Sequence, residues 1–425
     1  MSKPERSLDL NLDFHERHTS ELSSSWKETP RRWGHSLHKL APYVGGFPPS
    51  LAYYFIQRFS DQGDTILDPF CGGGTAPLEG ALRGRHTIGN DAFVYAYVLS
   101  AAKCNPLLTD QFKEYLASKL TEAKKVDNSD MRLLENDDLR VFYSDYTLDQ
   151  ILRLKKVLNG DNSGEATYLK AIICGILHGP SDMFLSLQTK DTYAGSVNYV
   201  RDYAEEHDLE KPEADIEPKA YKKQEIVTKN QIPRDLSDRT RVLQGDARDL
   251  DVAGESVDLI LTSPPYMRVL DYTWNNWIRL WWLGNDRKEE RENLDLTSDV
   301  SKYRAFMRDC VEEMYRVLSD DGVAVLIVGD VKKNLAGGTE IHNTARYIAE
   351  EAVEHTGFDV HEVIEDDYDV DNRGYVVFNQ LKYDYKPDEK EEKSKAPIDR
   401  CLVLKKGNPD LSEAPDINWD TVKYS

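Results

Sequence analysis

The sequence predicts an α/β fold with a doubly wound, mostly parallel sheet and a large, mainly helical insertion. Short apolar segments alternate with helical patterns in the first and last parts of the chain, as expected when helices connect parallel strands. A long polar stretch between those parts lacks strand patterns. The 425 residues suffice for one large domain with an insertion or for two ordinary domains, and the 40% hydrophobic content is typical of a globular protein.

The first strands and helices follow one another closely. Residues 65–68 are apolar and end in Asp68, and a glycine-rich turn leads from there into a helical pattern over residues 76–83. A second strand pattern covers residues 86–90, and a helical pattern covers residues 93–102. These segments predict a βαβ unit followed by a helix.

Strand patterns return in the second half of the chain. An uninterrupted apolar run over residues 322–328 is typical of a parallel strand that is buried on both faces. Because helical patterns separate the strands here too, these segments complete the predicted sheet. The other expected elements are strands at 241–244, 257–261, 361–364, 375–378 and 400–404 and helices at 303–318 and 344–354.

The domain boundaries follow from this distribution of patterns. Residues 1–104 contain an N-terminal segment and the first half of the α/β domain, residues 105–235 the insertion, residues 236–406 the second half, and residues 407–425 a tail. Expected features outside the sheet are insertion helices at 150–158 and 167–177, an aromatic-rich segment at 193–203, a lysine-dotted run at 211–229, a charged loop at 386–395 and a loosely held tail.

Composition excludes several classes of protein. The five cysteines are far apart and form no C-x-x-C pair, so we expect reduced thiols rather than a zinc site or a disulfide framework. No apolar run is long enough to cross a membrane, which predicts a cytoplasmic protein. The net charge of -21 argues against general binding of polyanions, so any nucleic-acid contact requires a local basic patch.

The turn after the first strand carries the clearest sign of a ligand site. Glycines there allow a ligand to approach the backbone, and the following helix presents free N–H groups at the carboxyl end of the strand. A dinucleotide-binding turn would have its third glycine where Pro77 stands, and no Gly-Lys-Ser/Thr phosphate loop is present. The turn consists of Asp68, Pro69, Phe70, Cys71, Gly72, Gly73, Gly74 and Thr75.

Two acidic residues end the second and third expected strands. Asp91 stands where a carboxylate can accept hydrogen bonds from both hydroxyls of a ribose, and Asp246 where it can bond the exocyclic amine of an adenine ring. Either alone could be an ordinary polar strand end. With the glycine turn, however, they place suitable groups at three neighbouring strand ends.

A second motif, Ser263-Pro264-Pro265-Tyr266, follows the strand at 257–261. The lone pair of an exocyclic amine on a nucleobase is delocalised into the ring and must be localised on nitrogen before it can attack a methyl sulfonium. The Ser263 hydroxyl and the Pro264 carbonyl can accept hydrogen bonds from such an amine, and the two prolines fix the backbone. Tyr266 can stack on an extruded base.

These two motifs resemble those of the amino-group DNA methyltransferases, specifically the cytosine-N4 branch with its Ser-Pro-Pro-Tyr signature, over roughly residues 34–330. The resemblance implies a Rossmann-like class I methyltransferase sheet, S-adenosylmethionine as methyl donor, no metal ion, and direct methylation of cytosine N4. It also implies that the segment at 38–49 closes over the cofactor and that Phe47 in this segment contacts it. Adenine-N6 methylation is the alternative, followed by RNA guanine-N2 methylation. A covalent cytosine-C5 mechanism lacks its cysteine beside the second motif.

The resemblance extends to partners. It implies double-stranded DNA as substrate, association with the nucleoid through that DNA, and a restriction-modification system in which a cognate endonuclease is a possible partner. The insertion is the expected target-recognition region. The aromatic residues between Tyr272 and Trp282 either stack on bases or pack within a helix.

Overall fold

The computed structural model describes most of the chain. The strand expected at 375–378 and the charged loop expected at 386–395 lie outside the described residues. The described residues are 26, 28–30, 33–127, 138–190, 193–267, 271–294, 297–335, 338–366, 399–411, 417–418, 422 and 424.

The central sheet contains seven strands: β1 (Thr65–Asp68), β2 (His86–Asp91), β3 (Thr240–Gln244), β4 (Val257–Thr262), β5 (Leu318–Gly329), β8 (Asp359–Asp366) and β9 (Asp399–Lys405). Their order is β3-β2-β1-β4-β5-β9-β8. Pairs from β3 to β5 are parallel, whereas β9 runs antiparallel to β5 and β8. The predicted fold class is confirmed. Because the strand order reverses between β1 and β4, their carboxyl ends flank the crevice where open α/β sheets bind ligands.

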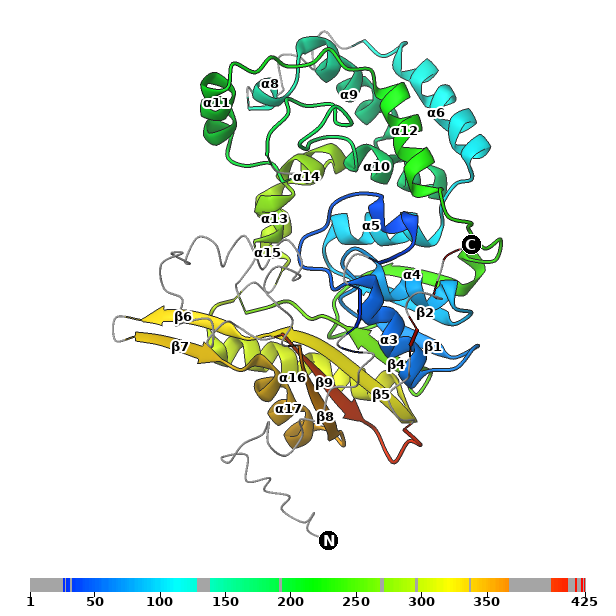
Figure 1. Ribbon diagram of the computed structural model, residues 1–425, viewed down its shortest axis with the longest axis vertical. Coiled ribbons are helices and arrows are strands. Elements are labelled where there is room, and N and C mark those ends of the chain that lie inside the picture. The colour runs from blue at the N-terminus through cyan, green and yellow to red at the C-terminus, as the bar shows by residue number, and fades with distance from the viewer. Residues whose placement is uncertain are drawn as a thin grey trace.

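Helices cover both faces of the sheet (Figure 1). Successive residues of β4 point to opposite faces, so Ile260 joins the core beneath two late helices while Leu259 and Leu261 join the core beneath an early one. The late helices are α16 (Val300–Val317) and α17 (Thr344–His355), the early one is α3 (Pro49–Phe59), and α4 (Thr75–Leu82) and α5 (Val94–Cys104) follow β1 and β2.

A helical lobe lies beyond α5, at the end of the molecule opposite the sheet (Figure 1). It shares one continuous apolar core with α5, to which Leu99 of α5, Ile172 of the lobe and Ile278 all contribute. Ile278 belongs to α14, which follows the second motif in sequence yet packs in this lobe. The lobe contains α6 (Thr109–Ala123), α8 (Leu139–Phe142), α9 (Asp145–Leu158), α10 (Gly164–Cys174), α11 (Val197–Glu206), α12 (Ile216–Val227) and α14 (Trp277–Leu283).

Several elements were not expected from sequence. The lysine-dotted run forms α12, and the tail is partly held in place, because Ile417 is buried and the Trp33 indole donates a hydrogen bond of 3.0 Å to the Val422 carbonyl. Among the described residues, no helix is long and apolar enough to cross a bilayer. The remaining elements are η1 (Ser36–Lys39), η2 (Ser237–Arg239), α13 (Tyr272–Asn275), α15 (Arg287–Glu292) and a hairpin of β6 (Val331–Leu335) and β7 (Gly338–His342).

Candidate functional site

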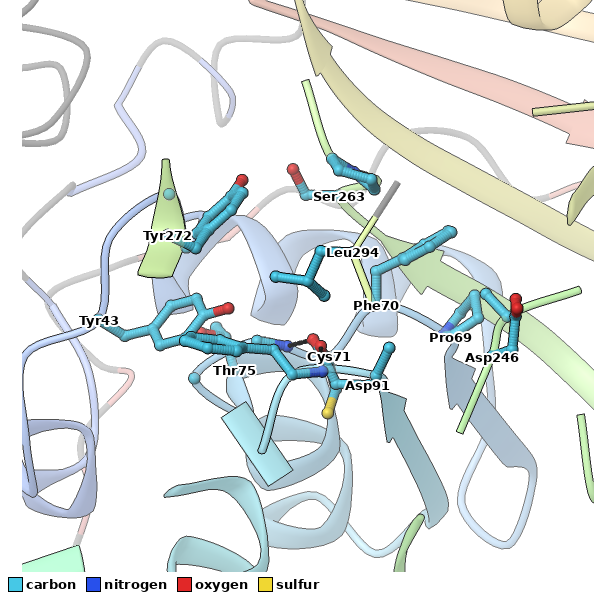
Figure 2. A pocket seen from close by; sticks show the side chains of 18 of the residues that line it. Tyr43, Pro69, Phe70, Cys71, Thr75, Asp91, Asp246, Ser263, Tyr272 and Leu294 are labelled. Atoms are coloured by element: carbon cyan, nitrogen blue, oxygen red, sulfur yellow. Dashed lines mark hydrogen bonds between the residues drawn. The ribbon is translucent and has the colours of Figure 1, made fainter. Parts of the chain in front are cut away.

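A pocket opens at the carboxyl ends of β1 to β4 (Figure 2). Nine residues expected at a ligand site line it: Phe47, Pro69, Phe70, Gly72, Thr75, Asp91, Asp246, Ser263 and Pro265. Asp68, Gly74, Pro264 and Tyr266 are not among its lining residues. The structure therefore brings both motifs to one cavity, although four of their residues stand behind its surface.

The glycine turn has a backbone that few other residues could adopt. Gly72 has φ 47° and Gly74 has φ 74°, both in the left-handed region. A Cβ atom on Gly72 would lie 2.7 Å from Cε1 of Tyr43, and one on Gly74 would lie 2.8 Å from Oγ of Ser100. Gly72 is thus needed at the pocket surface, whereas Gly74, the N-cap residue of α4, is needed for packing against α5.

Two side chains of α5 hold this turn from beneath. Ser100 donates a hydrogen bond of 2.8 Å to the Gly72 carbonyl, and the buried Lys103 ammonium donates to the Gly73 carbonyl. Burial lowers the pKa of Lys103 to about 8. Sequence reasoning missed both residues, because nothing in a helical pattern marks a serine or lysine that faces a turn some thirty residues away.

Asp91 connects the end of β2 to the turn. Its carboxylate accepts hydrogen bonds from the backbone N–H groups of Gly72, at 2.8 Å, and Phe93, at 2.9 Å. Burial raises the pKa of this carboxyl to about 6, against the effect of the two hydrogen bonds. Asp91 is therefore held in place by the turn while it lines the pocket.

Asp68 lies behind the pocket and joins two strand ends. Its carboxyl group accepts hydrogen bonds from the Thr262 hydroxyl, at 2.6 Å, and from the Phe70 N–H, at 3.2 Å. Burial raises its pKa to about 7, because desolvation outweighs these bonds. In this position Asp68 fixes β1 against β4 instead of facing the cavity.

The second motif presents Ser263 and Pro265 to the cavity. The Ser263 hydroxyl donates a long hydrogen bond of 3.5 Å to the Tyr266 hydroxyl oxygen. Burial, followed by the nearby Asp399 carboxylate, raises the pKa of Tyr266 well above its usual range. Pro264 is buried. The serine is thus the polar side chain of this motif that reaches the pocket surface.

Asp246 lines the pocket but already has a cationic partner. The Arg248 guanidinium donates to both of its carboxylate oxygens, at distances of 2.6–3.0 Å, and hydrogen bonding to Arg248 lowers the pKa of Asp246. Arg248 also lies 5.4 Å from the ring centroid of Phe306, another lining residue. A ligand that bonds Asp246 would therefore share its carboxylate with Arg248.

One side of the pocket is an aromatic wall formed by Tyr43 and Tyr272. Their rings are 6.4 Å apart between centroids and inclined by 24°. Figure 2 shows both on the side of the cavity away from Phe70 and Asp246. Tyr43 belongs to the segment at 38–49, in which only Phe47 was named as a cofactor contact, and Tyr272 was expected only within an aromatic tract. At the end of that tract, Trp282 packs into the helical lobe, and its indole N–H donates to the Lys170 carbonyl.

The segment that carries Tyr43 is anchored through a buried carboxylate. Glu79 of α4 accepts hydrogen bonds from His38, at 2.7 Å, and from the Tyr424 hydroxyl, at 2.6 and 2.7 Å. Arg83 lies 3.4 Å from the same carboxylate, and hydrogen bonding and charge from His38 lower the pKa of Glu79 despite its burial. This network connects the tail, α4 and the segment that leads into the aromatic wall.

The charge of the lining is one-sided. Among the described residues that line the pocket are the carboxylates of Asp91 and Asp246, but no lysine, arginine or histidine. Most of the remaining surface is glycine backbone, aromatic rings and apolar side chains such as Leu294 and Ala247, and the uncharged polar side chains are Thr75, Ser263, Asn293 and Cys71. Such a lining suits a cationic ligand with a flat apolar part and would leave a polyphosphate without a side-chain countercharge.

Comparison with known proteins shows the family of this chain. A family model described as DNA methylase matches residues 3–97 and 257–406, which together exceed half of the chain. The unmatched residues between these segments include all helices from α6 to α12. The match therefore covers both motifs and omits most of the helical lobe.

Curated relatives match more locally. The type II methyltransferase M.MjaII of Methanocaldococcus jannaschii is 30% identical over 135 residues, covering 30% of this chain and 26% of the relative. The type II methyltransferase M.BsoBI of Geobacillus stearothermophilus is 24% identical over 290 residues, covering 60% of this chain and 54% of the relative. The chain thus spans between about a quarter and about half of the length of these relatives.

Solved structures are more distant. A geranyl diphosphate C-methyltransferase from Streptomyces coelicolor A3(2) aligns with 91% of this chain and 99% of its own, at 9% identity and a TM-score of 0.37. This similarity is too low to support an argument about function. The match to the DNA methylase model over more than half of the sequence shows that the chain belongs to the DNA methylase family.

Proposed function

We propose that this protein is an S-adenosylmethionine-dependent DNA methyltransferase that methylates an exocyclic amine, and that its target is cytosine N4. The observation that carries the proposal is that one pocket contains both the Gly72 turn with its Asp91 carboxylate and the Ser263 hydroxyl. A cofactor held on the turn would therefore be next to the group that receives the amine.

The lining fits the proposed cofactor. S-Adenosylmethionine supplies a methyl group that is activated by the positive charge on its sulfur. Gly72 lines the pocket without a side chain, and Asp91 can accept hydrogen bonds from ribose hydroxyls. Phe70, Phe306 and Leu294 provide an apolar surface for a purine ring, with Asp246 at its edge.

In the proposed reaction, Ser263 and Pro264 align the amine of an extruded base. The Ser263 hydroxyl, whose hydrogen is directed to Tyr266, keeps its lone pairs free to accept from the amine. The Pro264 carbonyl is the proposed second acceptor, and two acceptors localise the nitrogen lone pair for direct attack. A covalent route through Cys71 is disfavoured, since burial raises the pKa of this lining thiol well above its usual range.

The helical lobe is the proposed contact to DNA. On its helix α11, the rings of Tyr199 and Tyr203 stack at 6.0 Å and 25°, Lys190 lies 5.7 Å from the Tyr203 ring, and Arg201 is exposed. The exposed Tyr199 ring can stack on a base, and the neighbouring cations can pair with phosphates. The lysines of α12 contribute less than expected, because Lys219 and Lys223 donate to carbonyl oxygens of the protein itself.

Titration of duplex DNA would test this surface. We expect that Lys190→Ala combined with Arg201→Ala lowers DNA affinity and flattens its dependence on salt concentration, because two phosphate contacts are lost. Arg140→Ala, which removes another cation of the lobe already paired with Asp145, is the matched control. Equal salt dependence in the double variant and the control would place DNA binding on another surface.

Analysis of nucleosides decides the reaction itself. DNA from cells that express the protein should contain N4-methylcytosine, and DNA from cells that express Ser263→Ala should contain at least about a hundredfold less. N6-Methyladenine in its place would show the adenine alternative, and methylation confined to RNA guanine would refute a DNA substrate. The type II names of the relatives extend the proposal to a restriction-modification system with a partner endonuclease, in which the methylated sites resist cleavage.

A further inference from the structure

We propose that the aromatic wall of Tyr43 and Tyr272, facing the Asp91 carboxylate, is a cation subsite that selects the charged sulfonium of the methyl donor over its neutral thioether product. This inference rests on the proposed function and concerns how the same pocket distinguishes the two forms of its ligand. It assigns a role to two residues that lie outside both sequence motifs.

The wall is assembled from distant parts of the chain. Tyr43 precedes α3, whereas Tyr272 begins α13, directly after the second motif. Their nearly parallel rings both line the cavity, and Tyr43 packs so closely on the turn that a Cβ atom on Gly73 would be 3.2 Å from its Cβ atom. In Figure 2, Tyr272 and Ser263 both lie above the turn, and Leu294 lies between Ser263 and the turn.

The electrostatics of this side favour a cation. Burial raises the pKa of both tyrosines above the ordinary range, so the rings stay neutral and present electron-rich faces. The Asp91 carboxylate accepts a hydrogen bond of 2.8 Å from the N–H of Gly72, and a Cβ atom on Gly72 would lie 2.7 Å from the Tyr43 ring, so the carboxylate is beside this wall. With no basic side chain among the described lining residues, a positive charge here meets attraction from the rings and from the carboxylate.

The attraction would act on only one form of the ligand. In the transfer, the bond from sulfur to the methyl carbon breaks, a bond from nitrogen to that carbon forms, and sulfur retains the electron pair and becomes neutral. The methylated amine then releases a proton to solvent. Once sulfur is neutral, the rings and Asp91 no longer hold a cation there, which would weaken retention of the product.

Equilibrium binding of the two ligands tests the subsite without measuring activity. The quantity of interest is the ratio of the Kd for S-adenosylhomocysteine to the Kd for S-adenosylmethionine, measured by calorimetry on the full chain. A desolvated cation–aromatic interaction of ~1–2 kcal/mol corresponds to roughly a five- to thirtyfold preference. Tyr272→Leu should reduce the ratio by about that factor, whereas Tyr272→Phe, which keeps the ring, should leave the ratio close to that of the wild type.

Further variants separate the possible failures. Tyr43→Leu should reduce the same ratio independently, and Tyr146→Leu, which changes an exposed tyrosine of the helical lobe, should not. Equal weakening of both ligands by Tyr272→Leu and by Tyr43→Leu would overturn the proposal, since it would show an apolar wall without charge selectivity. If the wild-type protein binds neither ligand, the proposed function itself fails, an outcome distinct from an unchanged ratio.

Discussion

The two sides of the pocket differ in how they are built. The pocket floor, defined as the turn from Pro69 to Thr75 with Asp91 and Asp246, lies at the ends of neighbouring strands, where the backbone itself fixes each group. The aromatic wall of Tyr43 and Tyr272 comes from two segments that meet only in the folded chain. The floor is thus a product of local strand-turn-helix geometry, whereas the wall depends on tertiary packing.

The largest expected effect comes from forcing floor and wall apart. We expect Gly72→Val to weaken S-adenosylmethionine binding by at least about a hundredfold, because its side chain would meet the Tyr43 ring and the left-handed backbone disfavours valine. Calorimetric titration measures the loss. Gly160→Val, with φ +75° and no atom near its Cβ position, applies similar backbone strain far from the pocket and is the control. If both variants bound S-adenosylmethionine with similar affinity, the assignment of the cofactor site to this turn would be wrong.

The floor could be predicted from sequence because its chemistry is local. Glycines at Gly72 and Gly74 and the acid at Asp91 occupy strand ends, and strand ends can be recognised from apolar runs. Ser263 could be predicted for the same reason. All four predicted residues absent from the lining are sequence neighbours of lining residues, so the motif is visible in sequence but its side-chain directions are not.

The wall could be predicted only in part, because the segment at 38–49 was expected to close over the cofactor but no local pattern marks Tyr43 or its pairing with Tyr272. The segment that precedes Tyr43 is held by contacts from distant parts of the chain, among them His38 on Glu79, which Tyr424 also bonds, and the Tyr95 hydroxyl on the Pro42 carbonyl. The pairing of a tail residue with α4 is a contact across most of the chain, and a single sequence contains no periodic signal for it. Lys103 escaped recognition likewise, since it looks like an ordinary helical lysine until the glycine turn lies beside it.

Asp68 distinguishes support of the floor from contact with the ligand. Its carboxyl pKa, raised to about 7 against an unfolded value near 4, means that the folded protein takes up a proton and loses stability as pH rises from about 4 to about 7. At pH 8, Asp68→Asn should therefore have a higher free energy of unfolding than the wild type, by up to about 4 kcal/mol because the two pKa values differ by about 3, and no such gain at pH 4; thermal unfolding measures both. Cofactor affinity should change little. If Asp68→Asn instead lost most of its affinity for the cofactor without a change in stability, Asp68 would be a residue that contacts the ligand.

Asp91 gives the floor a dependence on pH. Because burial raises its pKa to about 6, acidification below pH 6 protonates the carboxylate and removes both its charge and a hydrogen-bond acceptor. Affinity for S-adenosylmethionine should fall by roughly tenfold between pH 7 and pH 5. Asp246, whose pKa is lowered by Arg248, should not titrate in this interval. We expect Asp91→Asn to bind S-adenosylmethionine more weakly at pH 7, with an affinity that does not change between pH 7 and pH 5. If its affinity fell as steeply as that of the wild type, another group would be responsible for the titration.

The smallest expected effect concerns the anchor of the wall. Tyr424→Phe removes a hydroxyl that donates to the fully buried Glu79, but it keeps the ring that packs on Trp33 and Arg83. The segment leading to Tyr43 should then hold the wall less firmly. We expect S-adenosylmethionine to bind about two- to fivefold more weakly, because this loss of binding free energy is only a fraction of the free energy of one hydrogen bond to a charged group. The matched control is Tyr146→Phe, whose hydroxyl donates to Asp215 at the surface of the helical lobe. Tyr424 touches no lining residue among the contacts described. If Tyr424→Phe loses affinity while Tyr146→Phe does not, and circular dichroism shows that both variants keep the native fold, the wall depends on this distant anchor. Identical affinities in both variants would mean that His38 and Arg83 suffice to hold the segment on α4.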